Sequence, residues 1–349
     1  MLSTDQVRAT GAWIAAHQSA TGEIPWWPGG KGDPWDHVHA AMGLTVAGHI
    51  DEAAKAYSFL AKTQTSDGGW YAWRTDGKVS DRTQETNHAA YLASGLWHFY
   101  LATDDEEFLE EMWETLDHAI EFVIRLQRRS GAIDWALDPN RRPWNAPLLT
   151  GNASTHGSLV CALRIADLLG YTRPDWHVAR ERVATALVDT PEVFSSASVV
   201  ERVGRYAMDW YYPVLGGALR GAAARERLLD LDCHDAFIAQ GIGCRCVDDT
   251  PWYTVAETCE LILAFDSVGM SSHAQQIMSW IRQYRMDDGG YWTGKTWPED
   301  VFWPLEHNGW TAAAVIIAED ALAGGSATSS FFRDLSGDDL IADDEAVGA

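Results

Sequence analysis

The chain has 349 residues, of which 46% are hydrophobic and 22% charged, so it is long enough to bury a large core. Acidic residues outnumber basic residues by 50 to 26, and the formal net charge of −24 argues against nucleic acid, an anionic membrane surface or a polyanionic substrate as the main partner. A neutral substrate fits this charge better. The 18 tryptophans are more than core packing explains, because each buried indole N–H needs a hydrogen-bond partner.

The N-terminal segment and the cysteines indicate the cellular compartment in which the protein is expected. The opening MLSTDQVRATGAWIAAHQ lacks a basic segment followed by a continuous apolar run, so we expect no signal peptide. No apolar run is long enough to span a bilayer. No CxxC pair occurs among the five cysteines, Cys161, Cys233, Cys244, Cys246 and Cys259. Free thiols in a reducing cytoplasm are therefore expected. The oligomeric state is not indicated.

Helical periodicity predicts two kinds of helix that alternate along the chain. Helices of the first kind carry charge on one face and are expected at 5–18, 51–64, 105–127, 175–189, 222–240 and 272–285. Helices of the second kind are apolar nearly all round and are expected at 35–48, 85–101, 154–169, 207–220, 252–267 and 306–322. A helix that is apolar on all sides must be surrounded by other helices. The pattern predicts an all-α fold, an (α/α)6 toroid of six outer and six inner helices, and no convincing strand pattern is visible.

The toroid is expected to form one catalytic domain over residues 1–323. Residues 324–349 are acidic, small and polar, and we expect a mostly disordered tail in which Phe331 and Phe332 dock locally.

Four segments repeat one pattern, an apolar helix end followed by Gln, a polar turn with Gly, and then Trp. They are WIAAHQSATGEIPW, FLAKTQTSDGGWYAW, FVIRLQRRSGAIDW and SWIRQYRMDDGGYW, with the glutamines at 18, 64, 127 and 283. We expect each glutamine to hydrogen-bond exposed backbone where the helix ends. The repeat resembles the QW motifs of squalene–hopene cyclases and protein prenyltransferases, whose toroid is shared by six-hairpin glycosidases. This resemblance implies the fold, but a fold does not dictate the chemistry.

The loops that lead into the inner helices of a toroid open on one face, so the first residues of these helices should meet in a funnel. The candidate substrate-binding residues there are Trp35, His37, Asn87, His156, Tyr211, Trp252, Tyr253 and His307. The acids there are Asp36, Glu85, Asp209, Glu257 and Glu306. Aromatic rings stack on sugar faces, while His and Asn bind hydroxyl groups, so the set is typical of a carbohydrate site.

Each acid also has a structural interpretation. In DPWD, Asp33 fits an N-cap, Pro34 the first helical position and Asp36 the third, where an acid favours the helix dipole. Glu85 and Glu306 also lie near expected helix starts. Glu257 is expected two turns into a helix that Thr250 would cap.

A charge at that depth is costly unless it is paired or faces water. Arg205 or Arg245 could pair with Glu257. The functional alternative is a carboxyl group whose pKa is raised by an enclosed site.

Two carboxyl groups on opposite sides of a funnel suit glycoside hydrolysis. We predict Glu257 as the general acid and Asp36 as the general base, with Glu85, Asp209 and Glu306 in reserve. An inverting mechanism would separate the pair by roughly 6.5–9.5 Å. No cofactor or metal is expected.

Two alternatives remain open at this point. A cyclase needs a DxDD motif, which is missing, and a prenyltransferase would need zinc on Asp248, Cys246 or Cys259, and His307. A toroid that binds glycans without cleaving them would show aromatic residues but no suitable carboxyl pair.

A closer resemblance covers residues 22–44, GEIPWWPGGKGDPWDHVHAAMGL, and more loosely residues 249–263. These segments are similar to actinobacterial toroid proteins often labelled prenyltransferase-like, among which are mycobacterial hydrolases of methylmannose polysaccharide that act as α-(1→4)-endomannanases. The resemblance implies endo-acting hydrolysis of an α-linked mannan, with Asp36 and Glu257 as the carboxyl pair.

Overall fold

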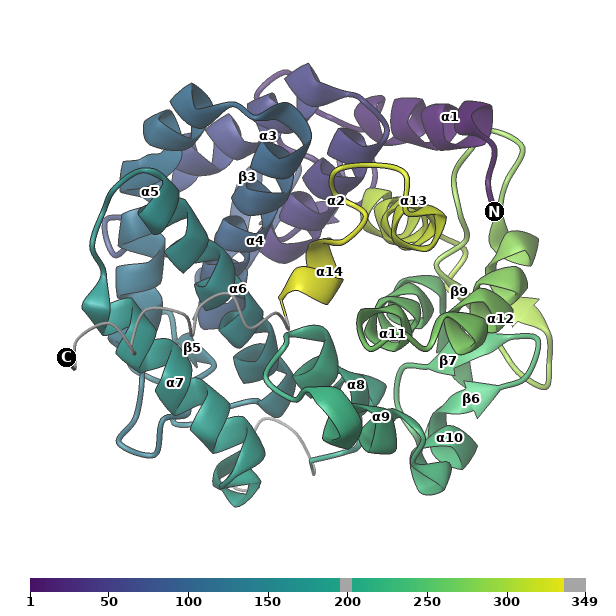
Figure 1. Ribbon diagram of the computed structural model, residues 1–349. Coiled ribbons are helices and arrows are strands. Elements are labelled where there is room, and N and C mark those ends of the chain that lie inside the picture. The colour runs from purple at the N-terminus through teal and green to yellow at the C-terminus, as the bar shows by residue number, and fades with distance from the viewer. Residues whose placement is uncertain (195–202, 336–349) are drawn as a thin grey trace.

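The computed structural model describes residues 1–194 and 203–335, within which thirteen of the fourteen α-helices build a closed double ring (Figure 1). The inner ring consists of α2 (Pro34–Val46), α4 (Thr86–Thr103), α6 (Leu149–Leu168), α8 (Ala207–Leu215), α11 (Val255–Ser267) and α13 (Gly309–Ala323). The outer ring consists of α1 (Thr4–Ala15), α3 (Ile50–Thr63), α5 (Glu106–Ile124), α7 (Pro174–Val188), α9 (Gly221–Leu228) with α10 (Leu231–Phe237), and α12 (Ser271–Ile281). Each inner helix packs on the next, and α13 returns to α2. The predicted toroid is confirmed.

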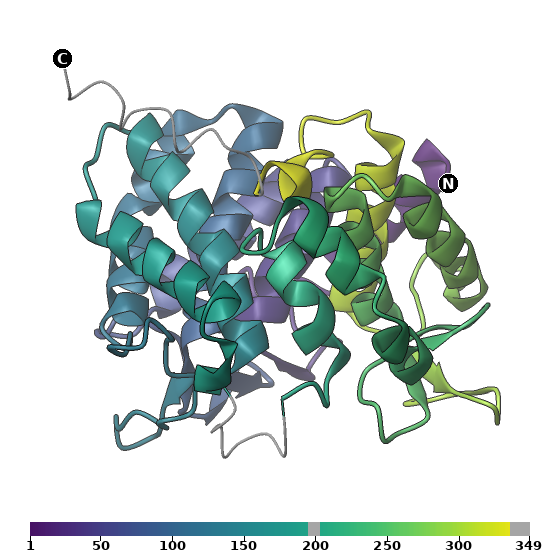
Figure 2. The ribbon, with the colours of Figure 1, turned by 60° about the horizontal axis from the view of Figure 1, so that its bottom comes forward.

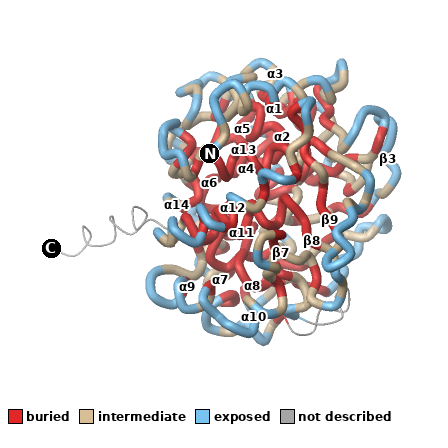
Figure 3. The backbone as a smooth tube through the Cα atoms, turned by 90° about the vertical axis from the view of Figure 1, so that its right-hand side faces the viewer, coloured by how far each residue is buried: buried red, intermediate tan, exposed pale blue. Residues whose placement is uncertain are grey.

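The inner helices are buried on nearly all sides, as the red core in Figure 3 shows. Small residues permit their close approach. A Cβ atom added to Gly43 of α2 would lie 2.5 Å from the Cβ atom of Ala313 in α13. No helix in the described part of the chain is both long and apolar enough to cross a membrane.

Some helix limits differ from the sequence-based prediction. The outer helix expected at 222–240 is interrupted, because Asp230 caps the separate helix α10 through the backbone N–H of Cys233. Short 3-10 helices follow α7 and α12, at η1 (Pro191–Phe194) and η2 (Arg282–Tyr284). Three inner helices begin elsewhere than expected, α6 at Leu149, α11 at Val255 and α13 at Gly309. These shifts change which side chains reach the funnel.

The sequence shows no convincing strand pattern, yet within residues 1–194 and 203–335 ten short antiparallel strands form three small sheets. The first contains β1 (Lys31–Gly32), β2 (Trp73–Thr75) and β3 (Lys78–Asp81), and the second β4 (Gln84–Glu85) and β5 (Ala136–Leu137). The third contains β6 (Ile238–Ala239), β7 (Gly243–Arg245), β8 (Trp252–Thr254), β9 (Gly294–Thr296) and β10 (Val301–Phe302), in the order β10-β9-β8-β7-β6. Strands of two to four residues are too short to show alternation in the sequence. They gather at the lower end of the barrel in Figure 2, where the inner helices begin.

The glutamine of the first three repeats joins its own turn to the next outer helix. Gln18 donates to the carbonyls of Gly22 (3.1 Å) and Glu52 (2.8 Å), Gln64 to Gly68 (2.9 Å) and Thr115 (2.8 Å), and Gln127 to Gly131 (2.9 Å) and Ala179 (2.9 Å). The fourth, Gln283, donates to Gly241 and Trp280, both at 2.8 Å. The predicted backbone role of these glutamines is confirmed.

The opposite end of the barrel is covered by the C-terminal segment. Helix α14 (Phe331–Asp334) lies over the centre of the ring in Figure 1, and Phe331 and Phe332 are 2% and 9% exposed. Arg333 donates to Asp266 at the end of α11 over 2.6 Å. The expected tail is therefore packed through residue 335, because its aromatic residues fill the end of the barrel. The remainder of the expected disorder, residues 336–349, lies outside the described residues.

Candidate active site

A pocket of about 370 Å³ opens where the inner helices begin, and all six of them contribute to its wall. The residues that line it are Trp26, Asp33, Trp35, Asp36, Trp73, Glu85, Asn87, His88, Thr150, Gly151, Ser154, Met208, Tyr212, Trp252, Glu257, Glu260 and Trp310. A second pocket of about 280 Å³ adjoins it and shares Glu85, Asn87, Thr150, Gly151 and Met208. The predicted funnel is present.

Asp36 occupies the predicted position at the third residue of α2. Asp33 is the N-cap, and its Oδ1 accepts a hydrogen bond from the Asp36 backbone N–H over 2.9 Å. The other oxygen of Asp33 accepts from the indole N–H of Trp26 over 3.3 Å. Asp36 is 8% exposed, and its pKa is raised well above the usual value by burial, by the neighbouring charge of Asp33 and, less strongly, by Glu257. Asp36 is therefore a buried acid at a helix start, directly beside a second acid.

Glu257 lies at the third residue of α11 rather than two turns into the helix. The prediction from Thr250 is wrong because residues 252–254 pair as β8 with both β7 and β9, which keeps the backbone extended as far as the N-cap Thr254. Glu257 therefore occupies the same helix position as Asp36.

The environment of Glu257 nevertheless sets it apart from a capping acid. It is 5% exposed, burial raises its pKa, and its Oε2 has no hydrogen-bond partner in the described part of the chain. Arg245 donates instead to the Asp248 carbonyl and the Tyr253 hydroxyl, so it is not the ion-pair partner weighed from the sequence. Likewise, Arg205 pairs with Asp249.

Two of the reserve acids are engaged by protein donors. Glu85 accepts the indole N–H of Trp135 over 2.8 Å, and its Oε2 lies 3.4 Å from His88 Nε2. Asp209 accepts the Thr150 hydroxyl over 2.7 Å and the Gly204 backbone N–H over 2.9 Å. Glu85 lines both pockets, while Asp209 lines the smaller one.

The third reserve acid, Glu306, lines neither pocket. It precedes the N-cap of α13, Asn308, and its backbone carbonyl accepts from Thr293.

Among the predicted substrate-binding residues, Trp35, Asn87 and Trp252 line the main pocket. Trp35 stacks on Tyr91 with ring centroids 3.6 Å apart and an interplanar angle of 11°. One face of Trp35 is therefore held by the protein.

Three others lie behind the wall. Tyr211 donates to Glu260 over 2.9 Å, Tyr253 accepts from Arg245 over 2.9 Å, and His307 contacts the rings of Trp13 and Trp292.

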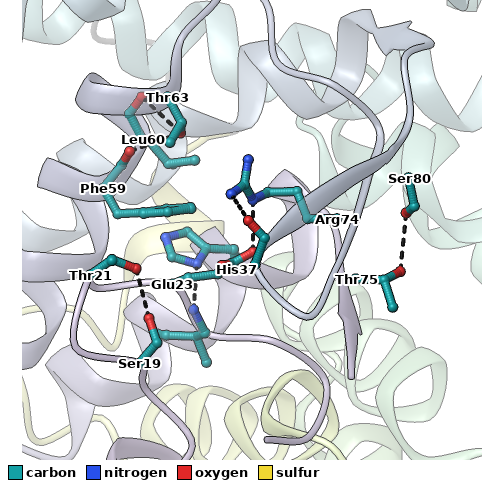
Figure 4. A network of polar contacts seen from close by, with 12 residues as sticks. Ser19, Thr21, Glu23, His37, Phe59, Leu60, Thr63, Arg74, Thr75 and Ser80 are labelled. Carbon is teal, nitrogen blue, oxygen red and sulfur yellow. Dashed lines mark hydrogen bonds and ion pairs between the residues drawn. The ribbon is translucent and has the colours of Figure 1, made fainter. Parts of the chain in front are cut away.

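His37 and His156 line neither pocket, and both are bonded within the protein. Figure 4 shows His37 beside the Glu23–Arg74 ion pair, where its Nδ1 accepts from the Ile24 N–H and its Nε2 contacts the Ala56 carbonyl. His156 contacts the Gly216 carbonyl over 2.8 Å and lies inside α6 because that helix begins earlier than expected. Burial lowers the pKa of each histidine to about 4.

Sequence reasoning missed several pocket residues, Trp26, Trp73, Met208, Glu260 and Trp310. Glu260 lies one turn after Glu257 at the floor of the pocket, and its carboxylate accepts from Tyr211 (2.9 Å) and Tyr212 (2.5 Å). Burial raises its pKa to about 8. The three-residue spacing from Glu257, which places both acids on one helix face, was the available signal.

The zinc set considered for a prenyltransferase is not assembled. Among residues 1–194 and 203–335, no three His, Cys, Asp or Glu side chains are grouped to hold a metal ion. All five cysteines are free thiols, and Cys246 lies beside Glu257.

Comparison with curated proteins decides the family. The chain is 43% identical over 333 residues to an MMP endo-(1,4)-3-O-methyl-α-D-mannosidase of Mycolicibacterium hassiacum, across 95% of this chain and 90% of that protein. The chain belongs to this family. It is thus a member of a glycoside hydrolase family, as its carboxyl pair predicted, and neither the isoprenoid enzyme nor the non-catalytic glycan binder is supported. No family model matches the sequence.

Three solved structures of low sequence identity to this chain share its fold. A wild-type glycosidase superposes with a TM-score of 0.70 at 14% identity, over 91% of this chain and 96% of the other. A D-mannose isomerase gives 0.67 at 9% identity, over 92% and 96%. A sugar epimerase from a ruminal bacterium gives 0.65 at 12% identity, over 91% and 99%. These likenesses show the toroid alone.

Proposed function

We propose that the protein hydrolyses internal α-(1→4) bonds of a 3-O-methylmannose polysaccharide with Asp36 and Glu257 as its carboxyl pair. The observation that carries this proposal is the meeting of two buried acids, each at the third residue of an inner helix, in one pocket lined by tryptophans. The family relationship supports the substrate class. The net charge of −24 suits a neutral polysaccharide.

In the proposed reaction, Glu257 is the general acid. Burial raises its pKa more than the neighbouring Thr254 and Cys246 side chains lower it, so the proton stays on the carboxyl group until the leaving glycosidic oxygen takes it. As the bond between the anomeric carbon and that oxygen breaks, Glu257 becomes a carboxylate.

Asp36 is the proposed general base. Burial and Asp33 raise its pKa, and the Trp26 indole opposes them by stabilising the carboxylate form, which removes a proton from the attacking water. The oxygen of that water bonds to the anomeric carbon from the opposite face, which inverts the configuration.

The first experiment incubates the full-length protein with a 3-O-methylated α-(1→4)-mannooligosaccharide and follows the products by proton NMR. Shorter oligosaccharides with an initially β-configured reducing end support an inverting endo-hydrolase. An initially α-configured product contradicts inversion. No product from α-mannans or α-glucans, together with turnover of a prenyl diphosphate, contradicts the hydrolase.

A second experiment separates the roles of the two acids. Glu257→Gln should keep most activity on a glycosyl fluoride, whose leaving group needs no proton, whereas Asp36→Asn should lose it. The reverse result would exchange the roles.

Two further points belong to this proposal. The five free thiols support action in a reducing cytoplasm. The catalytic unit is proposed as residues 1–323, with residues 324–349 as an appendage whose first part covers the barrel end.

A further inference from the structure

The second pocket extends the active site along the mouth and has a different chemical character. The side chains and helix starts that line it include Trp135, Pro147, Leu148, Leu149, Tyr206 and Met208. Met208 lines both pockets and so stands where they join. A sugar bound next to the reacting unit would therefore lie against a largely apolar wall.

Three of the four carboxyl oxygens on this wall, both of Asp209 and one of Glu85, are engaged by the protein. Both oxygens of Asp209 accept hydrogen bonds, from Thr150 and from the Gly204 backbone. Glu85 Oε2 accepts the Trp135 indole and lies beside His88. These contacts leave apolar atoms as the main surface offered to a ligand.

Such a wall discriminates between a free and a methylated sugar hydroxyl. A free hydroxyl buried against apolar side chains loses its hydrogen bonds to water without replacing them, which costs free energy. A methyl ether carries no hydrogen to donate, and burying its methyl group is favourable.

We propose that this second pocket is a subsite for the O-methyl group of a sugar unit adjacent to the hydrolysed bond, and that Met208 is a specificity-determining residue there. The inference rests on the proposed function, because it assumes that the main pocket binds an α-(1→4)-mannan. The proposal adds the place in the site at which the O-methyl group is recognised.

The test compares kcat/KM for two mannooligosaccharides of equal length, one 3-O-methylated and one unmethylated. Wild type should prefer the methylated substrate, and Met208→Gln should reduce that preference about tenfold, the discrimination expected for one apolar group in a hydrophobic pocket. Met208→Leu, which keeps the apolar surface, should retain the preference. Met286→Gln is the matched control, since Met286 lines neither pocket, and should change neither rate constant.

Equal loss of activity on both substrates in Met208→Gln, or no preference in wild type, would overturn the subsite. The thermal midpoint of each variant shows that it folds. If wild type cleaves neither substrate, the proposed function fails, and calorimetric binding of the two oligosaccharides decides the subsite separately. Tighter binding of the methylated ligand that Met208→Gln abolishes would support it, and equal binding would refute it.

Discussion

The turns that contain Gln18, Gln64, Gln127 and Gln283, here called the glutamine turns, lie at the same end of the barrel as the starts of the inner helices. The two regions differ in how far they repeat the same contacts. The first three glutamine turns use the same two hydrogen bonds, one within the turn and one to the next outer helix. The inner-helix starts instead place a different set of side chains at each position around the pocket. The repeated hydrogen bonds therefore stabilise the closed ring, whereas the side chains that differ from one helix start to the next form the candidate active site.

The comparison is clearest for acids at one helix position. Asp36, Asp209 and Glu257 are each the third residue of an inner helix. Asp209 has both oxygens bonded within the protein, whereas Glu257 has an oxygen without a partner in the described residues. The position explains why an acid is tolerated, and the unfilled hydrogen-bonding capacity indicates which acid is available for catalysis.

The largest expected effect concerns the helix starts. Asp36→Asn should lower kcat by about a thousandfold while the thermal midpoint stays near that of wild type, because Asp33 remains the cap of α2. Reducing-sugar release and a thermal melt of the same preparation measure both quantities. Retained turnover with a loss of about 1 kcal/mol in the free energy of unfolding would assign Asp36 to helix initiation alone.

The next effect concerns a glutamine turn. In Gly68→Ala, φ is +92° and the new Cβ would lie 2.0 Å from the backbone oxygen of His118, so the free energy of unfolding should fall by about 3 kcal/mol. Gly170→Ala is the matched control, with φ of +78° and no atom within 4 Å, and should cost only about 1 kcal/mol. Urea unfolding measures both. Equal losses would show that the turn is not a close contact between outer helices.

Removing a turn's side-chain hydrogen bonds should have a smaller effect. Gln64→Leu deletes the bonds to Gly68 and Thr115, and the free energy of unfolding should fall by about 2 kcal/mol, with kcat of the folded enzyme retained. Gln283→Leu provides a comparison, because Gln283 bonds different carbonyls and also accepts from Lys295. A loss of activity without a loss of stability in Gln64→Leu would contradict a purely structural role for this turn.

The smallest effect concerns Glu260, whose pKa is raised to about 8 in the folded protein. Between the ordinary glutamate pKa and 8, the folded state binds a proton that the unfolded state releases, so stability falls as the pH rises. Glu260→Gln should remove up to about 1 kcal/mol per pH unit of this slope. Urea unfolding at several pH values between 5 and 8 tests it, and an unchanged slope would show that Glu260 does not hold this proton.

The ring of helices was predictable because helix periodicity is a local property of the sequence. The strands were not, since the pairing of β8 with β7 and β9 joins segments more distant in the chain. Without that pairing, Thr250 and Pro251 resemble a helix start, and Glu257 was assigned to the wrong turn. The acid itself was still selected.

Side-chain direction was the other missing information. His37 follows Asp36 directly, yet successive residues of a helix point about 100° apart, and His37 faces Ile24 and Ala56 rather than the pocket. The exact start of each helix therefore decides which neighbour reaches the funnel. Residue type alone does not fix this direction, since His156 lies on an inner helix but faces Gly216 rather than the main pocket.

The cover that α14 forms over the far end of the barrel makes the molecule a cup rather than a tube. A polysaccharide cannot thread through a cup, so it must lie across the rim, and both fragments must depart from the side by which the chain arrived. The packing of Phe331 and Phe332 thus restricts substrate entry and product exit to the end of the barrel where the inner helices begin.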